Sequence, residues 1–198
     1  MTLKSFLQRH WVIVLPLVFE LTVFGAWVHP GLLLGGDFLR RSRGELLSFF
    51  PWPHAWNPAQ QSGENNEVYL FAFPLFAVMG VLARIGFPWT VIERLVYFWP
   101  ALVVAVVAPY ALLLRLTRNR WGAASGAAIF CINGFTIMAL ERGAVPSMIA
   151  VALLCFIVLL GIQFVERPSA RLGFWYAAIL CITLMYDLRY VYFAIILS

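Results

Sequence analysis

The sequence predicts an all-α integral membrane protein, a polytopic helix bundle of about five to six spans with one re-entrant helix and a large external loop. Three observations lead to this class. Of the 198 residues, 63% are hydrophobic and only 12% are charged, about half the charged share of a typical soluble domain. Long apolar runs alternate with short polar turns. One polar, aromatic-rich loop covers residues 30–66. Residues 1–198 are predicted to form a single transmembrane domain.

The charge distribution indicates which partners the chain has. The net charge of +5 comes from 14 basic and 9 acidic residues, and the basic residues lie in short loops instead of one patch. We therefore interpret them as topology signals and contacts to lipid phosphates, which excludes nucleic acid as a partner. Cys131, Cys155 and Cys181 each stand alone in an apolar run, without metal-ligand spacing, and are predicted to behave as small hydrophobic residues.

The first apolar run, Trp11–His29, is predicted to be a retained signal-anchor span. Lys4 and Arg9 precede it, Glu20 interrupts it, and no cleavage pattern follows it. A bilayer core of about 30 Å needs about 20 helical residues. By that measure the later spans are predicted at Leu95–Leu114, Trp121–Leu140, Val145–Val165 and from Leu172 onward.

The segment Val68–Phe87 is apolar enough to insert but contains Pro74 and ends near Arg84. If it does not cross, and the N-terminus is cytoplasmic, seven of the fourteen basic residues face the cytoplasm: Lys4, Arg9, Arg115, Arg118, Arg120, Arg167 and Arg171. A crossing would move most of them outside, against the positive-inside tendency. We therefore predict a cell-membrane protein with a cytoplasmic N-terminus and a re-entrant or interfacial helix over residues 68–87.

The last apolar run contains an ionisable pair, Asp187 and Arg189. Counted from Leu172, Asp187 lies about 22 Å along a helix axis. Such a pair is expected to face a cavity or the bundle interior, or else to mark a helix end. The run then continues to Ser198 without a polar terminus, which predicts that the gene product is longer and the chain truncated at its C-terminus.

Asp37 follows two glycines directly after the apolar residues at the end of the first span. A carboxylate there could act as a general base towards an acceptor hydroxyl, or it could bind a divalent cation. The sequence assigns no other cofactor and identifies no metal. The alternative, of about equal weight, is that the Gly-Gly-Asp turn caps the following helix.

The external loop continues with aromatic and polar residues between prolines. Trp52, His54, Trp56 and Asn57 combine rings with imidazole and amide groups, which suits the stacking and hydrogen bonding of a sugar. An aromatic belt at the membrane interface would explain the tryptophans equally well. Glu64 belongs to a polar stretch that is either a substrate-contact loop or a solvated turn.

Three acid–arginine pairs recur on the predicted outer side: Glu93-Arg94, Glu141-Arg142, and Asp187 with Arg189. Each pair taken separately is expected to be a structural ion pair. Their convergence on one face of the bundle would instead indicate a site.

Three stretches carry a family likeness: Gly36-Asp37, the run from Trp56-Asn57-Pro58 to Pro74, and Phe87–Leu95. They resemble the N-terminal part of GT-C-type membrane glycosyltransferases, in particular the large bacterial arabinofuranosyltransferases and YfhO-like membrane proteins. The resemblance covers about residues 10–165, and such enzymes continue for further spans.

The resemblance implies transfer of a sugar from a polyprenyl-phosphate donor to a glycan or lipid acceptor on the outer membrane face. In that family an aspartate of the first external loop is the candidate base, and Asp37 matches it. The expected substrate-binding residues are Arg94, Arg189, Asp187, Glu64, Trp52, His54, Trp56 and Asn57. The alternative is a non-catalytic accessory subunit of a larger membrane complex, which the short length favours.

Overall fold

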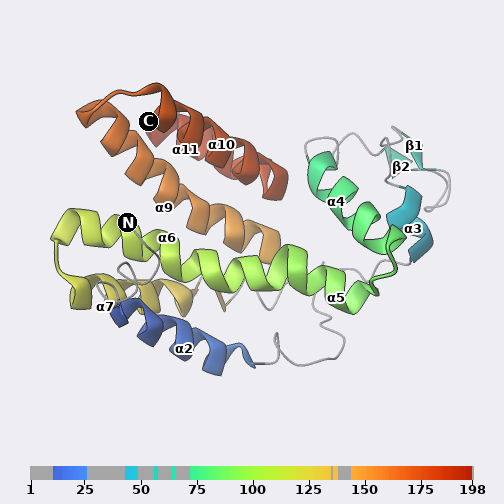
Figure 1. Ribbon diagram of the computed structural model, residues 1–198, viewed down its shortest axis with the longest axis horizontal. Coiled ribbons are helices and arrows are strands. Elements are labelled where there is room, and N and C mark those ends of the chain that lie inside the picture. Colours follow the sequence, from blue (N-terminus) through green and yellow to red (C-terminus); the bar gives the residue numbers. More distant parts are fainter. Residues whose placement is uncertain are drawn as a thin grey trace.

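The computed structural model describes residues 11–25, 43–48, 56–57, 64–65, 72–134, 136–137 and 144–197. Apart from turns, these residues are helical except for one antiparallel pair of short strands, β1 (Trp56–Asn57) and β2 (Glu64–Asn65). The predicted all-α class is therefore confirmed for the part of the chain that the structure describes. Figure 1 shows one long central helix running through the bundle.

The helices that precede the central one are η1 (Trp11–Ile13), α2 (Val14–Val23), α3 (Arg43–Ser48) and α4 (Phe73–Arg84). The central helix consists of α5 (Trp89–Glu93), the π-helical turn η4 (Arg94–Phe98) and α6 (Trp99–Thr117). After it come α7 (Arg120–Cys131), α9 (Val145–Glu166), α10 (Ala170–Tyr186) and α11 (Leu188–Leu197).

Two of these helices are long and apolar enough to cross a membrane, judged by length and composition. They are the 29-residue central helix Trp89–Thr117 and the 22-residue α9, Val145–Glu166. At 1.5 Å per residue they measure about 43 Å and 33 Å, which exceeds a bilayer core of about 30 Å. Three shorter apolar helices accompany them: Trp11–Val23, Phe73–Arg84 and Ala170–Tyr186.

Two tight turns close helical hairpins at the same end of the bundle. Between α6 and α7, Asn119 Oδ1 accepts the N–H groups of Trp121 and Gly122 at 3.0 and 3.2 Å. Between α9 and α10, Ser169 Oγ accepts the N–H of Leu172 at 3.3 Å. Side-chain caps of this kind satisfy donors that the first turn of a helix leaves open. Both hairpins therefore start their second helix with a cap encoded in the turn.

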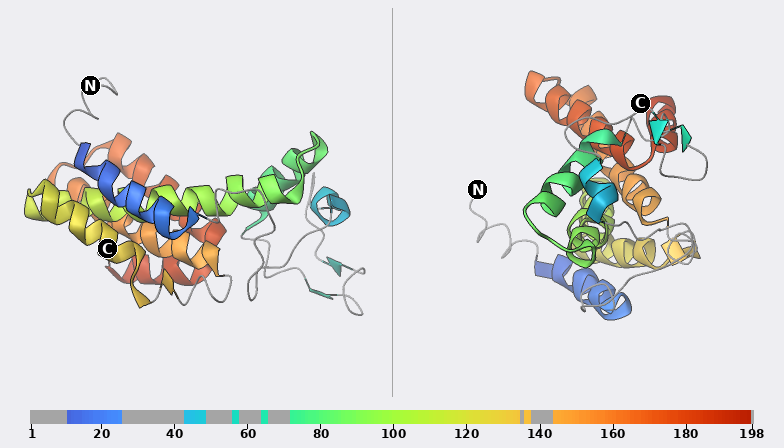
Figure 2. Two further views of the ribbon diagram at one scale, coloured as in Figure 1. Left: turned by 90° about the horizontal axis from the view of Figure 1, so that it is seen from below. Right: turned by 90° about the vertical axis from the view of Figure 1, so that its right-hand side faces the viewer.

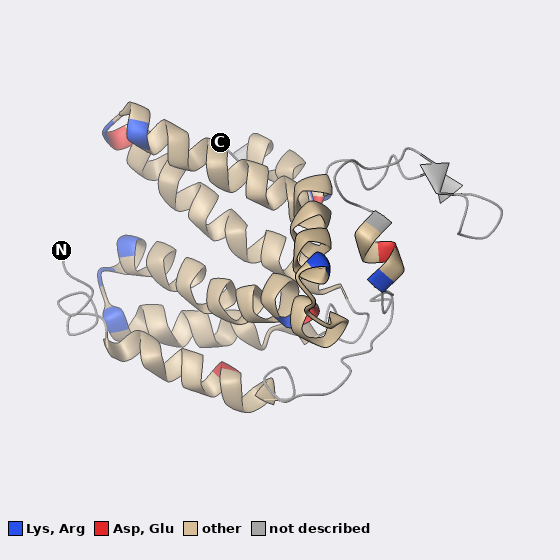
Figure 3. Ribbon diagram, turned by 45° about the vertical axis from the view of Figure 1, so that its right-hand side comes forward, with Lys and Arg blue, Asp and Glu red and all other residues tan. Residues whose placement is uncertain are grey.

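The hairpin turns form an arginine-rich end, which we define by Arg115, Arg118, Arg120, Arg167 and Arg171. Arg115 of α6 pairs with Glu166 of α9, so the two helices finish side by side. Trp11, at the start of η1, lies with its ring 5.7 Å from that of Trp121. The N-terminal helix therefore begins at the arginine-rich end as well, and Figure 3 shows basic residues of the ribbon, in blue, at this end.

The segment predicted as re-entrant contains α4, whose twelve residues span about 18 Å. That length is shorter than a bilayer core of about 30 Å. Pro74 lies in the first turn of α4, where its missing N–H breaks no helical hydrogen bond. A turn around Gly86, at φ 102°, then joins α4 to α5. Figure 2 shows α4 at the far end of the central helix from the hairpin turns; its placement relative to a membrane stays a prediction.

One predicted span is wrong in its extent. The helix expected over Trp121–Leu140 ends at Cys131. Asn133 accounts for the break, because its amide Nδ2 donates to the carbonyl of Phe130 at 2.5 Å and its Oδ1 accepts the N–H of Thr136 at 3.0 Å. A polar side chain that bonds neighbouring backbone groups competes with the helical pattern.

Small residues bring α7 close to the central helix. Ala123 and Ala127 of α7 are fully buried, as is Ala105 of α6. A Cβ added at Gly126 would collide with Cδ1 of Leu113 on α6. Small residues at such spacing let helix backbones approach closely, which is the usual basis of helix packing in membranes.

We expect Gly126→Leu to destabilise the α6–α7 hairpin by about 1–3 kcal/mol, the typical cost of overpacking. Gly122→Ala is the matched control, because its Cβ would meet Asn119 only at an ordinary 3.6 Å. The measurement is thermal unfolding of the detergent-solubilised protein. Equal unfolding temperatures for Gly126→Leu and the unchanged protein would show that the two helices do not depend on this close approach.

Candidate functional site

The last apolar run is interrupted at Asp187, which separates α10 from α11. Its backbone is extended, with φ −161° and ψ 109°. Asp187 Oδ1 accepts the N–H of Arg189 at 3.1 Å, so the carboxylate caps the first turn of α11. Asp187 therefore marks a helix end, and its carboxylate is also buried in the bundle interior, as both expectations for this residue allowed.

Asp187, Arg189 and Ser147 form one cluster, which we call the Asp187 cluster. Arg189 Nε donates to Asp187 Oδ1 at 2.9 Å and its Nη2 donates to Asp187 Oδ2 at 2.6 Å. Ser147 Oγ, from the first turn of α9, donates to Asp187 Oδ2 at 2.6 Å and accepts Arg189 Nη2 at 3.2 Å. The guanidinium is thus held in a bidentate, planar pair, the strongest geometry for arginine and carboxylate.

The two charges of the cluster differ in their exposure. The Asp187 side chain is 8% exposed, whereas that of Arg189 is 76% exposed. Among the described residues, the hydrogen bonds of the Arg189 guanidinium use Nε and Nη2, which leaves the Nη1 donors pointing away from the pair. The arrangement orients an arginine at the surface by means of a buried acid. It can present two N–H donors to a phosphate or carboxylate.

Tyr186 links the cluster to the central helix. Its hydroxyl donates to the backbone carbonyl of Val96 at 2.9 Å, and its ring meets that of Tyr97 edge-on at 6.3 Å. Val96 lies four residues before Pro100, which has no N–H to offer its carbonyl. The π-helical turn at Arg94–Phe98 stands at the same place, and such turns are common at functional sites. Tyr186 therefore supplies the donor that the proline removes.

Arg94 opens this π-helical turn, and it is buried. Its side chain is 6% exposed, and Nη1 lies 3.1 Å from Glu93 Oε1. The same Nη1 donates to the carbonyl of Thr90 at 2.5 Å.

The Glu93–Arg94 pair lies near the start of the central helix and the Asp187 cluster at the start of α9. These helices contact one another there and run side by side to the Arg115–Glu166 pair, so both groups lie at the end of the bundle opposite the arginine-rich end. Among the described residues, no hydrogen bond or ion pair joins the Glu93–Arg94 pair to the Asp187 cluster. They are connected through the hydrogen bond from Tyr186, next to Asp187, to the carbonyl of Val96, two residues after Arg94.

The other predicted site residues lie partly or wholly outside the described residues. Asp37, Trp52 and His54 are outside them. Trp56 and Asn57 form β1 and Glu64 belongs to β2, with Asn57 opposite Glu64 in the register. The ladder brings the backbones of two predicted substrate-binding residues together, and the structure describes none of these side chains.

The sequence did not predict Ser147 as a site residue, and it marked Glu20 only as an interruption of the first apolar run. A serine in a first helical turn resembles an ordinary cap, so its sequence position gave no sign that Asp187 would be its partner. Glu20, on α2, is fully buried, and neither of its carboxyl oxygens has a hydrogen-bond partner among the described residues. An acid inside an apolar run was the available signal for it. Within the described ranges, no three His, Cys, Asp or Glu side chains lie close enough to hold a metal ion.

Comparison of the chain with protein-family models, with curated proteins and with solved structures found no match. The glycosyltransferase resemblance therefore rests on the motifs of the sequence.

We expect Tyr186→Phe to lower the free energy of unfolding by about 1–3 kcal/mol, the cost of leaving a buried polar group without its partner. The effect should shrink when Pro100→Ala restores an N–H four residues after Val96. A double-mutant cycle of the two changes, followed by denaturant unfolding in detergent, measures this coupling.

Tyr192→Phe is the control for that cycle, since Tyr192 is 62% exposed and lies on the neighbouring helix α11. An equal loss of stability for Tyr186→Phe with and without Pro100 would contradict the proposed link.

Proposed function

We propose that the protein is a multi-span membrane protein with five to six membrane segments and a cytoplasmic N-terminus. The support is the gathering of arginines at one end of the helices, where both hairpin turns and the start of η1 lie. Positive charge concentrates in cytoplasmic loops, so this end is assigned to the cytoplasm. The Asp187 cluster and the Glu93–Arg94 pair then lie on the outer side.

On this arrangement we propose a GT-C-type glycosyltransferase that passes a sugar from a polyprenyl-phosphate donor to a glycan or lipid acceptor at the outer face. The observation that carries the proposal is Arg189, an exposed guanidinium oriented by buried Asp187 at that end of the bundle. Such a fork suits a donor phosphate. Asp37 would serve as base or cation contact, as the motif resemblance implies, and the loop around Trp52, His54 and Trp56 would receive the sugar.

Within this proposal the two arginines have unequal roles. We assign the main contact with the donor phosphate to Arg189, because its side chain is 76% exposed. Arg94 is 6% exposed and engaged with Glu93 and the Thr90 carbonyl. Direct contact between Arg94 and the donor would require those bonds to break, so we assign Arg94 only a secondary role in donor binding.

The second candidate function is a non-catalytic accessory subunit of a larger membrane complex. A specific observation favours it: the charged groups at the outer end are held within the chain, as Asp187 with Arg189 and Glu93 with Arg94. Ion pairs of this kind fix helix breaks and packing without any chemistry.

The topology is tested by cysteine labelling. Single changes Ser42→Cys, Ser62→Cys and Ser169→Cys are made in a background in which the native cysteines are replaced. An impermeant maleimide applied to intact cells should label positions 42 and 62 and leave 169 silent, because 169 lies at the arginine-rich end. Labelling at 169 alone would reverse the orientation and remove the outer-face chemistry with it.

The enzymatic role is tested by Asp37→Asn. Transfer of radiolabelled sugar from polyprenyl phosphate in reconstituted membranes should fall about 10²–10⁴-fold, the usual contribution of a positioned general base. Arg189→Ala should mainly raise the KM for the donor, since a charge-assisted contact contributes about 1.5–3 kcal/mol.

Glu166→Gln is the matched control for these variants, an acid-to-amide change at the opposite end of the bundle. Unchanged transfer by Asp37→Asn would remove Asp37 from the mechanism. Transfer that appears only with a second purified component, and is insensitive to both site variants, would favour the accessory role.

A further inference from the structure

We propose that a groove between α9, α10 and α11 binds an acyl chain of an anionic phospholipid, whose headgroup is held by Arg167 and Arg171. This inference rests on the proposed membrane arrangement and is independent of sugar transfer. It places a lipid site at the arginine-rich end, on the opposite side from the Asp187 cluster.

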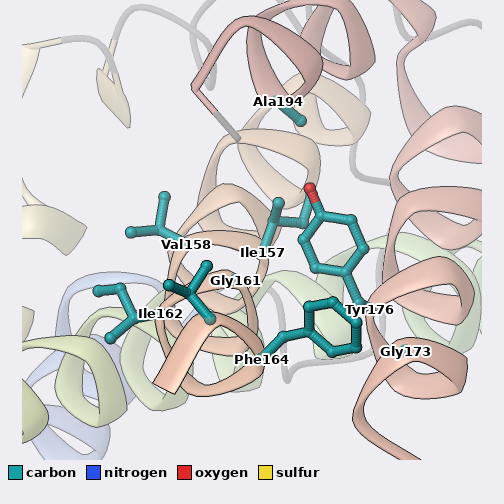
Figure 4. Close-up of a pocket in the computed structure, with 9 residues that line it drawn as sticks. Ile157, Val158, Gly161, Ile162, Phe164, Gly173, Tyr176 and Ala194 are labelled. Carbon is teal, nitrogen blue, oxygen red and sulfur yellow. The ribbon is translucent and has the colours of Figure 1, made fainter. Parts of the chain in front are cut away.

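The groove has a volume of about 540 Å³, within the range of roughly 300–1,000 Å³ that small-molecule sites occupy. Figure 4 shows it lined by side chains of all three helices. Its walls include Ile157, Phe164, Tyr176 and Ala194. The Tyr176 hydroxyl is the one polar side-chain group among the residues that line it. The groove therefore suits a hydrocarbon chain.

Two glycines create the hollow. A Cβ at Gly161 would lie 3.7 Å from Cε2 of Tyr176, and a Cβ at Gly173 would lie 3.5 Å from Cε2 of Phe164. Both distances are ordinary contacts, so the helices do not need glycine for close backbone approach here. Larger side chains at the same positions would instead occupy the space of the groove.

The charged residues near one end of the groove indicate which kind of lipid it binds. Phe164 lies three residues before Arg167, and Gly173 lies two residues after Arg171. The intervening acid, Glu166, is paired with Arg115. Among the described residues neither Arg167 nor Arg171 forms an ion pair, and both are exposed.

An apolar groove whose lining residues Phe164 and Gly173 lie within three residues of two exposed arginines complements a molecule with a long apolar tail and an anionic head. Basic pockets between membrane helices on the cytoplasmic side bind anionic headgroups in this way. Charge complementarity thus favours an anionic phospholipid over a second apolar helix, which would leave both arginines without a counter-charge.

The test is a lipid titration of the delipidated protein in a neutral detergent, read by native mass spectrometry. Phosphatidylglycerol should bind about thirtyfold more tightly than phosphatidylcholine with the same acyl chains, from two arginines near the headgroup. The double variant Arg167→Gln, Arg171→Gln should abolish that preference, whereas Arg120→Gln, at the same end on α7, should retain it.

Gly161→Leu should weaken phosphatidylglycerol binding about tenfold or more, and Gly161→Ala should bind like the unchanged protein. Circular dichroism confirms that each variant keeps its helix content; if Gly161→Leu does not fold, the arginine variants decide. Equal binding of the two lipids would overturn the proposal, as would glycerol phosphate binding as tightly as the whole lipid. A change of oligomeric state in Gly161→Leu without loss of lipid would assign the groove to a second copy of the chain.

Discussion

The central helix Trp89–Thr117 contains two prolines, and the rest of the packing compensates for the backbone donors that they remove. Pro100 leaves the carbonyl of Val96 without its usual partner, and Tyr186 donates to it from α10 at 2.9 Å. Pro109 likewise leaves the carbonyl of Ala105 without its usual N–H partner. The Cys131 thiol of α7 donates to that carbonyl at 3.5 Å. Because a buried carbonyl without a partner is costly, each proline fixes where a neighbouring helix must lie.

These two contacts have consequences beyond the central helix. Tyr186 immediately precedes Asp187, so its attachment to Val96 also fixes the helix break from which Arg189 is presented. Cys131 is the last residue of α7, so its bond to Ala105 fixes the end of that helix against the central helix. The prolines of the central helix therefore determine both the packing of its neighbours and the position of the candidate site.

The two ends of the bundle differ in how their charges are used. At the arginine-rich end the basic residues are exposed and, apart from the Arg115–Glu166 pair, unopposed among the described residues. At the other end two arginines are each matched by an acid one or two residues away, Glu93 for Arg94 and Asp187 for Arg189. Unopposed charge favours lipid headgroups, whereas a matched pair can hold one guanidinium in a fixed orientation. The groove and the Asp187 cluster reflect these two uses.

The sequence by itself determined the helical class, because apolar runs of this length leave few alternatives, and it determined which turns carry arginine. It also pointed to Asp187 and Arg189, since an ionisable pair inside an apolar run demands a partner or a helix end. It did not determine that α7 would stop at Cys131, where the local bonds of Asn133 outweigh an apolar run. Only the tertiary structure decided that Ser147 would join Asp187, 40 residues away, and that Tyr186 would reach Val96, 90 residues away. Such pairings depend on how whole helices pack, and hydropathy along a chain carries no information about which side chain meets which carbonyl.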